Sequence, residues 1–252
     1  MRLSLPATLL LALISPASAD WSTAAMNRHI DQTNFMVNDG CSGTLVDLKA
    51  RYILTANHCV QDQYEVIERE KVGDDGVITK ERVRRAKAGT VKQLYFNGAS
   101  ETHEITYRTK LIATDSDKDL ALLKIVSESI PNTIAAKIAC VAPQRGDTIY
   151  VVGNPMGILY SSVVKGIVSS TQRDYGMIGL DPDNEGLTQI SSGVIGGNSG
   201  GAAYNADGYL VGVPVRASRV NEILGFAVTL ESVTAFLKKN ATSDLFEHCA
   251  SI

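Results

Sequence analysis

Short stretches rich in Val, Ile, Leu and Thr recur along the chain, with turn signals between them. Stretches of about four to eight such residues, with alternating or clustered apolar positions, are typical of β-strands. Turn signals such as Asn97-Gly98 and Asp207-Gly208 separate many of them. Many short strands and little helix predict an all-β fold, either a barrel or a sandwich. The predicted strands are residues 43–46, 52–56, 120–126, 148–152, 163–169, 189–192, 209–215 and 225–228.

Residues 230–240 have a helical rather than a β pattern. Val233, Phe236 and Leu237 recur at helical spacing, and the segment begins with an acidic residue and ends with two lysines. Negative charge at the start of a helix and positive charge at its end favour the helix dipole. One helix is therefore predicted near the C-terminus.

Residues 65–87 are a dense mixture of Glu, Lys, Arg and Asp. Such runs are usually solvated, so a hairpin or surface loop is predicted, with a regulatory loop or self-cleavage site as the alternative. The strand pattern is interrupted again between residues 130 and 145, where Pro131 and Pro143 occur. We therefore predict two domains, residues 20–130 and 131–252.

The first 19 residues have the pattern of a secretory signal peptide. Arg2 precedes an apolar run at residues 9–14, and Ser15-Pro16 is followed by the small residues 17–19. The apolar run is much shorter than the roughly 20 residues that a membrane-spanning helix needs. Cleavage after Ala19 is expected, and with it a secreted or periplasmic protein.

Charge and composition exclude several function classes. The formal net charge is −3 with both signs interspersed, which gives no basic footprint for nucleic acid. No later segment is apolar enough to span a bilayer, so membrane insertion after signal cleavage is not expected. The oligomeric state cannot be inferred from these features.

The four cysteines suggest two disulfides, because their number is even and export is expected. Their spacing alone permits three pairings, and no pair has the C-x-x-C spacing of a zinc cluster. The histidines other than His58 are also scattered along the sequence, so no metal and no cofactor are expected. The residues concerned are Cys41, Cys59, Cys140, Cys249, His29, His103 and His248.

Three local motifs carry candidate chemistry. His58 ends the stretch Thr-Ala-Asn-His, Asp119 leads into an apolar strand, and Ser199 lies in a glycine-rich turn. A serine hydroxyl is a weak nucleophile at neutral pH, so an imidazole must accept its proton during attack. A carboxylate on the far side of the imidazole fixes its tautomer and stabilises the imidazolium. The predicted roles are general base for His58, orienting carboxylate for Asp119 and nucleophile for Ser199.

The tetrahedral intermediate of acyl transfer also needs donors for its oxyanion, commonly backbone N–H groups. Glycines around Ser199 let the chain turn sharply and bring amides close to a substrate. We assign the predicted oxyanion hole to the N–H groups of Gly197 and Ser199.

The chain order His, Asp, Ser separates this set from other triads. An α/β-hydrolase, whose G-x-S-x-G motif residues 197–201 formally match, needs its histidine after the serine. Only His248 lies there, and the strand–helix alternation of that fold is missing. The second alternative is a pseudoprotease that binds partners without catalysis. The intact triad favours catalysis.

These motifs resemble those of trypsin-like (chymotrypsin-fold) serine proteases, most closely the HtrA/DegP branch without its PDZ domains. The matching segments are residues 55–59, 119–125, 152–157, 197–201 and 225–228. The resemblance implies an all-β, chymotrypsin-like fold of two six-stranded antiparallel β-barrels with a C-terminal helix. It places the site between the barrels and implies a serine endopeptidase acting on proteins or peptides.

The resemblance also implies a disulfide pairing. Cys41 and Cys59 match the pair that closes the histidine loop of many trypsin-like enzymes, although HtrA proteases often lack it. Cys140 and Cys249 would then form the second bridge.

Two departures from the family pattern matter. Trypsin zymogens place an aspartate just before the serine, where it pairs with the freed N-terminus, but this chain has Asn198. We therefore expect activity without zymogen cleavage, or control by loop ordering as in HtrA proteins. Only a helix and a tail follow residues 225–228, so a PDZ module is not expected.

The resemblance places the P1 pocket between the segment before Ser199 and a later strand. Nothing acidic lies at its expected base, so small or medium apolar P1 residues are predicted. A preference for acidic residues, attracted by Arg216, is the alternative. The predicted pocket residues are Gly193, Val194, Gly196, Val213 and Val215.

Overall fold

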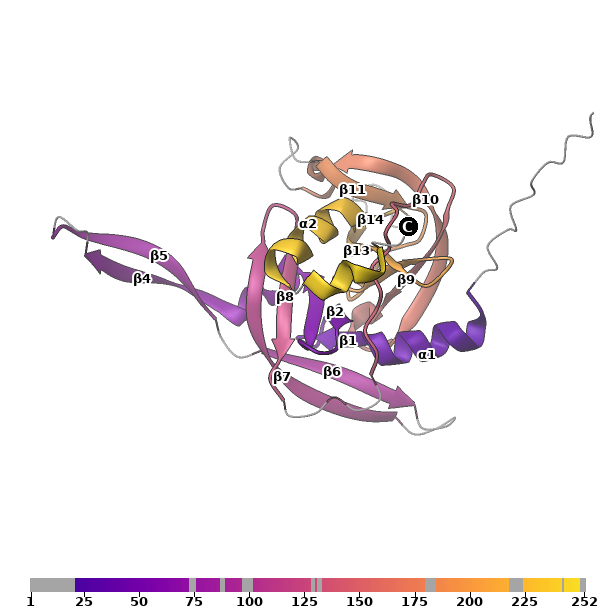
Figure 1. Cartoon of the computed structure of the whole chain (residues 1–252), viewed down its shortest axis with the longest axis horizontal. Helices are drawn as coiled ribbons and strands as arrows, with labels where there is room; N and C mark the ends of the chain where they lie inside the picture. The colour runs from indigo at the N-terminus through magenta and orange to yellow at the C-terminus, as the bar shows by residue number, and fades with distance from the viewer. Residues whose placement is uncertain are drawn as a thin grey trace, which may run out of the picture.

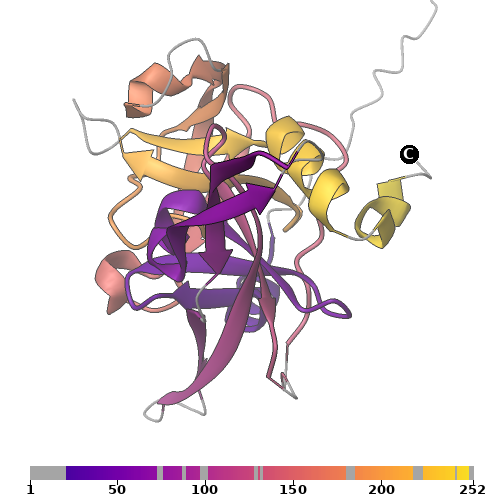
Figure 2. The same cartoon turned by 90° about the vertical axis from the view of Figure 1, so that its left-hand side faces the viewer.

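The computed structural model describes residues 21–72, 76–86, 89–96, 102–127, 130, 133–179, 185–217, 224–241 and 243–249. The predicted signal peptide lies outside these residues. Two closed β-barrels make up the body of the molecule, and every paired strand in them is antiparallel (Figure 1, Figure 2). The predicted fold of two six-stranded antiparallel barrels is confirmed.

The first barrel follows the order β1-β2-β3-β8-β7-β6, and β1 pairs with β6 to close it. Its last strand in sequence, Leu120–Ile125, is buried at every position except Lys124. The strands are β1 (Asn34–Val37), β2 (Cys41–Asp47), β3 (Tyr52–Ala56), β6 (Gly89–Phe96), β7 (Thr102–Asp115) and β8 (Leu120–Ile125).

The second barrel follows the order β10-β11-β14-β13-β12-β9 and closes through β9 and β10. Residues 126–147 connect the two barrels, and the predicted domain boundary falls within this connection. The strands are β9 (Thr148–Gly153), β10 (Ser162–Asp174), β11 (Glu185–Ile190), β12 (Ala202–Asn205), β13 (Leu210–Ala217) and β14 (Gly225–Thr229).

The C-terminal helix α2 (Leu230–Asn240) has the bounds that the sequence pattern predicts. Thr229 caps its N-terminus by accepting a hydrogen bond from the Ser232 N–H, at 3.4 Å. Val233 and Leu237 are fully buried because they face the barrels, whereas the lysines at the end of the helix are exposed. No helix in the described part of the chain is long and apolar enough to cross a membrane.

A second helix, α1 (Thr23–Thr33), precedes the first barrel and was not predicted. An aromatic cluster of Trp21, His29 and Tyr204 joins it to β12 of the second barrel. Ring centroids lie 5.0 Å apart for Trp21 and His29, and 5.0 Å apart for His29 and Tyr204. Helix α1 therefore contacts the second barrel, although it precedes the first barrel in the sequence.

Burial lowers the pKa of His29 to about 4, so this imidazole is neutral in the folded protein at pH 7. The unfolded chain, with a pKa near 6.5, binds more protons between about pH 4 and 6.5. The free energy of unfolding should therefore fall as pH decreases through that window. After a discount for partial exposure we expect a loss of about 1–2 kcal/mol from His29 between pH 7 and 4.5.

Urea unfolding of the wild type and of His29→Phe at both pH values tests this expectation. The variant lacks the titrating group but keeps an aromatic ring, so the wild type should lose more stability on acidification. Equal losses in both proteins would mean that His29 does not contribute.

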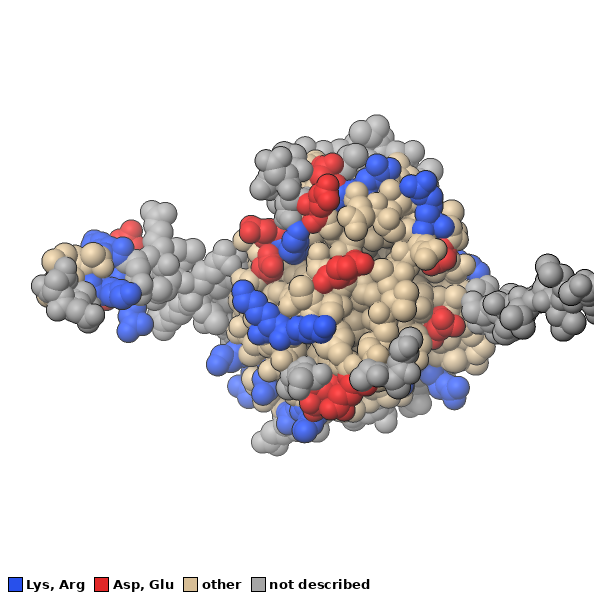
Figure 3. All heavy atoms as spheres, turned by 45° about the horizontal axis from the view of Figure 1, so that its top comes forward, with Lys and Arg blue, Asp and Glu red and all other residues tan. Residues whose placement is uncertain are grey.

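The charged segment forms a two-stranded hairpin in its described residues, in agreement with the solvated-hairpin interpretation. Strands β4 (Tyr64–Val72) and β5 (Ile78–Ala86) pair only with each other and project away from the barrels (Figure 1, Figure 3). The side chains of residues 68–71 and 76–80 are exposed, and Lys80 lies 3.8 Å from Glu68. An exposed ion pair of this kind contributes little stability.

Both cysteine pairs lie at disulfide distance and match the pairing that the resemblance implies. The sulfur atoms are 2.05 Å apart in Cys41–Cys59 and 1.98 Å apart in Cys140–Cys249. The first pair joins β2 to the short 3-10 helix η1 (Asn57–Gln63), and the second joins the inter-barrel connection to η4 (Ser243–Cys249). Two further 3-10 turns are η2 (Pro155–Gly157) and η3 (Tyr175–Ile178).

Candidate active site

His58 and Asp119 form a closely bound pair within the first barrel. His58 lies in η1, directly after β3, and its Nδ1 is 2.7 Å from Asp119 Oδ2. The backbone N–H of His58 donates to Asp119 Oδ1 at 2.9 Å. Both carboxylate oxygens therefore face His58, so Nδ1 carries its proton toward Asp119 and Nε2 is left as the basic nitrogen. The side chain of Asp119 is 7% exposed and that of His58 is 27% exposed, which leaves the ring accessible from one side.

The turn before β8 fixes Asp119 in place. Asp119 has φ +54°, and its carbonyl accepts a hydrogen bond from the Asn57 N–H at 3.1 Å. The hydroxyl of Tyr175, from η3 of the second barrel, donates to the carbonyl of the preceding residue Lys118 at 3.2 Å. Burial, followed by the charges of Asp119 and Asp115, raises the pKa of Tyr175, so this hydroxyl stays protonated as a donor.

Ser199 lies in a tight turn between the barrels. Gly200 has φ +81°, and a Cβ there would lie 2.2 Å from Thr55 Oγ1 and 2.8 Å from the Ala56 N atom. Only glycine permits this contact, which brings the turn against the end of β3, two residues before His58. The turn of Ser199, from the second barrel, therefore lies against the end of the strand of the first barrel that leads to His58.

The hydroxyl of Ser199 donates to the Val215 carbonyl at 2.9 Å. Among the hydrogen bonds of the described residues, none joins this hydroxyl to His58. Ser199 is 8% exposed, so its hydroxyl needs an acceptor when no substrate is present. The acceptor is a carbonyl of β13, in the segment where the sequence places one wall of the P1 pocket.

The backbone donors assigned to the oxyanion hole are available. Within the described parts of the chain, the N–H groups of Gly197 and Ser199 donate no hydrogen bond. Both residues are buried. Buried N–H groups without an acceptor are rare in folded proteins, and at a reactive serine they fit an anion that forms during reaction.

The predicted pocket residues divide into two groups. Val194, Val213 and Val215 are buried, and the Val194 side chain packs so close to β14 that a Cβ on Gly225 would lie 2.4 Å from it. Gly193 is partly buried, whereas Gly196 is exposed. Arg216 is also exposed, and its guanidinium donates to the Ile178 carbonyl at 2.8 Å.

Two groups of described residues have side chains close enough to bind a metal, and each consists of one histidine and two cysteines. Their members are Cys41, His58 and Cys59, and Cys140, His248 and Cys249. Because the cysteines of each group are joined to each other, neither group offers the thiolates that metal binding needs.

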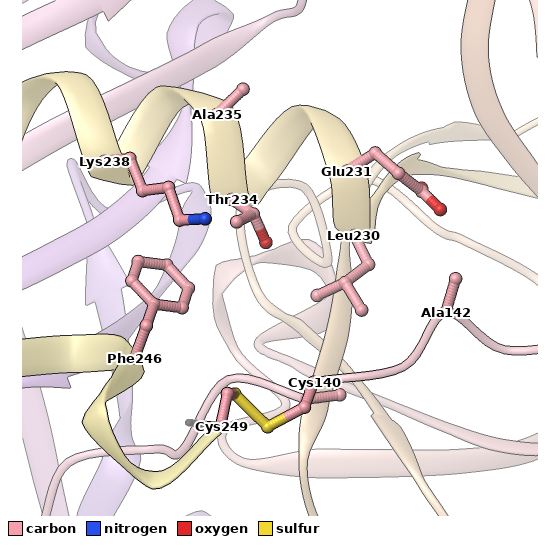
Figure 4. A pocket seen from close by; sticks show the side chains of 10 residues that line it. Cys140, Ala142, Leu230, Glu231, Thr234, Ala235, Lys238, Phe246 and Cys249 are labelled. Carbon is pink, nitrogen blue, oxygen red and sulfur yellow. A yellow bond between two sulfur atoms is a disulfide. The ribbon is translucent and has the colours of Figure 1, made fainter. Parts of the chain in front are cut away.

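The protein also has a cavity of about 450 Å³ between α2, η4 and the second disulfide (Figure 4). Leu230 and Phe246 line it, with Lys238 over the Phe246 ring at 5.4 Å. None of its lining residues belongs to the set predicted for catalysis.

Sequence reasoning missed two buried polar residues next to the Ser199 turn, Ser42 and Asn154. Ser42 is 0% exposed and Asn154 is 1% exposed, and the two are hydrogen-bonded to each other across the barrel interface. Asn154 belongs to the matching segment 152–157, which carries no predicted role for it, and Ser42 belongs to none of the motifs. Their role depends on burial and on a contact between distant residues, which the sequence does not display.

A family model described as a trypsin-like peptidase domain matches residues 41–213. The match covers every motif on which the candidate site depends, from Cys41 to the turn of Ser199. The chain belongs to the trypsin-like peptidase family. Its curated relatives include HtrA-, DegP- and DegS-type serine proteases.

Serine protease HTRA1A of Danio rerio is 31% identical over 170 residues, which cover 67% of this peptidase chain and 33% of the relative. Serine endoprotease DegS of Haemophilus influenzae is 26% identical over 233 residues, covering 90% of this chain and 57% of the relative. A probable periplasmic DegP-like serine endoprotease of Rickettsia prowazekii is 36% identical over 142 residues, covering 53% and 27%. The chain thus spans between about a quarter and three fifths of these relatives' lengths.

Solved structures support the fold of the peptidase. The serine endoprotease from Yersinia pestis superposes with a TM-score of 0.58 at 23% identity, covering 87% of this chain and 67% of that one. The HtrA-type protease AlgW with a tripeptide superposes with a TM-score of 0.62 at 23% identity, covering 90% of this chain and 64% of that one.

Proposed function

We propose that this chain is a serine endopeptidase that hydrolyses peptide bonds through His58, Asp119 and Ser199. The observation that carries the proposal is the double hydrogen bond between His58 and Asp119 beside a serine turn with two available N–H groups. This arrangement supplies a base of fixed tautomer, a nucleophile and an oxyanion site.

In the proposed reaction, the Ser199 hydroxyl leaves the Val215 carbonyl and turns to Nε2 of His58. His58 takes the proton as Oγ attacks the substrate carbonyl, and the N–H groups of Gly197 and Ser199 bind the oxyanion. The imidazolium then gives its proton to the leaving amine, and an acyl-enzyme remains. Water, activated by His58, hydrolyses this ester and restores Ser199.

We propose that this activity needs no zymogen cleavage. The Asn198 side chain is 2% exposed and lies against Gly153, where a Cβ would be 2.7 Å from its Oδ1. A neutral amide cannot form the ion pair through which a freed N-terminus activates trypsin zymogens. Contacts within the folded chain already hold the Ser199 turn, including the hydrogen bond from the Gly200 N–H to the Pro214 carbonyl at 2.8 Å.

For the substrate, we propose small or medium apolar P1 residues in proteins or peptides. The buried valines of the predicted pocket support this preference. The acidic alternative has less support, because the guanidinium of Arg216 is already bound to Ile178. A secreted or periplasmic location is proposed from the predicted signal peptide, and the DegP-like relative of Rickettsia prowazekii, named as periplasmic, is in line with it.

Labelling with a fluorophosphonate probe tests the proposed function. Fluorophosphonates react with serine hydroxyls that have an assembled base and oxyanion hole. Intact-mass detection should find a single adduct on the native protein, and peptide mapping should place it on Ser199. Protein unfolded in urea has the same serines without the site and serves as the control. A folded protein that stays unlabelled, or is labelled at another serine, would contradict the proposal.

A further inference from the structure

Ser42 contacts the carbonyls of both residues that supply the proposed oxyanion hole. Its hydroxyl lies 2.7 Å from the Gly197 carbonyl oxygen, and its backbone N–H donates to the Ser199 carbonyl at 2.8 Å. Ser42 belongs to β2 of the first barrel, whereas Gly197 and Ser199 belong to the second. One buried residue thus holds the turn from across the interface.

The direction of the Ser42 hydroxyl is fixed by Asn154. The backbone N–H of Asn154 donates to Ser42 Oγ at 2.7 Å, and Asn154 Nδ2 donates to the same atom at 3.0 Å. These donors occupy both lone pairs of the hydroxyl. Its single proton must therefore point at the Gly197 carbonyl.

The amide of Asn154 is held by four groups. Its Oδ1 accepts from Asn34 Nδ2 at 2.9 Å and from the Ser161 N–H at 3.0 Å, while its Nδ2 donates to the Phe35 carbonyl at 3.0 Å as well as to Ser42. Rotating the amide by 180° would place donors against donors and acceptors against acceptors. Hence the buried network permits one orientation of Asn154 and one of Ser42.

Hydrogen bonds hold the peptide planes on both sides of Gly197. The carbonyl of Gly196 accepts from the Met156 N–H at 2.6 Å, and in a planar trans peptide the Gly197 N–H points the opposite way. Gly197 has φ +102°, and a Cβ there would lie 2.2 Å from the Asn154 carbonyl oxygen. A glycine in such a place has wide rotational freedom unless its peptide planes are held. Met156 holds the plane before Gly197, and Ser42 holds the plane after it.

We propose that Ser42 is a positioning residue of the reaction, whose hydroxyl, oriented by Asn154, keeps the Gly197 N–H aimed at the oxyanion. The inference rests on the proposed function and deepens it. Ser42 does not touch the substrate and acts through the backbone of Gly197. Loss of the Ser42 hydroxyl should therefore reduce the stabilisation of the transition state and leave ground-state binding of the substrate almost unchanged.

Ser42→Ala tests the proposal through kcat, KM and the rate of fluorophosphonate labelling. Removing an oxyanion donor outright costs about 10²–10³ in kcat, and a misdirected donor should cost less. We expect kcat and the labelling rate to fall together by about 10- to 100-fold, with KM within about threefold of wild type. Rates are compared below the unfolding temperature of each protein, as determined by circular dichroism.

Two further variants separate positioning from general loss of structure. Ser170→Ala removes another buried hydroxyl, which donates only to the neighbouring Thr171 carbonyl in β10, and should keep the wild-type kcat. Asn154→Asp keeps the side-chain volume but turns the donor at Ser42 into an acceptor, which competes for the hydroxyl proton. It should reproduce the kcat loss of Ser42→Ala, and it decides the question if Ser42→Ala does not fold.

The outcomes distinguish the two proposals. A wild type that the probe does not label overturns the proposed function and the role of Ser42 with it. A labelled wild type, with folded Ser42→Ala or Asn154→Asp reacting at the wild-type rate, overturns only the role of Ser42. A change confined to KM, or an equal loss in Ser170→Ala, would also overturn it.

Discussion

Ser199→Ala is expected to lower kcat for peptide hydrolysis by about 10⁶-fold while KM changes little. The turn that carries Ser199 is held by backbone contacts, among them the bond between its carbonyl and the Ser42 N–H, so the variant should fold normally. What disappears is the nucleophile, and with it the acyl-enzyme route. Initial rates on a peptide substrate, with sensitivity over at least six decades, provide the measurement.

His58→Ala and the double variant provide the control for this prediction. Base and nucleophile act as one unit, so His58→Ala should cost about as much as Ser199→Ala, and the double variant no more than either. Losses that multiply in the double variant would mean that the two residues act independently. The triad proposed here would then be wrong.

Asp119→Asn is expected to lower kcat by about 10⁴-fold. The asparagine oxygen can keep the hydrogen bond from the backbone N–H of His58. The amide nitrogen of the asparagine then faces ring Nδ1, where a carboxylate oxygen lies at 2.7 Å in the wild type. Nδ1 must then accept, so the ring proton moves to Nε2, and the base needed by Ser199 is lost. Steady-state rates near neutral pH measure the effect.

Asp115→Asn is the matched control for Asp119→Asn. The Asp115 carboxylate accepts hydrogen bonds from the N–H groups of Asp117 and Lys118 and supports the same turn. Its Oδ1 makes these contacts without involving His58, so the change should lower kcat by no more than a few fold. Equal losses at positions 115 and 119 would mean that turn structure, rather than the tautomer of His58, explains the effect.

The sequence allowed the fold to be predicted, and the candidate reactive residues to be proposed, because their signals are local. The motifs at His58, Asp119 and Ser199 are each a few residues long, and their order along the chain selects one fold family. The bounds of α2 were also predictable, because a cap, an apolar face and end charges coincide within residues 229–240. The structure pairs His58 with Asp119 and places the turn of Ser199 against the end of β3.

Other features depend on contacts between distant residues and left no local signal. Ser42 and Asn154 are 112 positions apart, and nothing near either residue indicates that they share a hydrogen bond. The hydroxyl of Ser199 points to Val215, which only the folded turn could reveal. Helix α1 was missed because its apolar face is narrow and is completed by Trp21, outside the helix, against Tyr204.

The Cys140–Cys249 bridge makes the second barrel a covalent ring. Its two cysteines are 109 positions apart, and all the strands from β9 to β14, with Ser199 and α2, lie between them. Hydrolysis of one peptide bond inside this ring adds one water molecule to the protein. The two pieces stay joined by the disulfide until it is reduced. A peptidase that nicks itself there would therefore migrate as one species on a non-reducing gel and separate into two only after reduction.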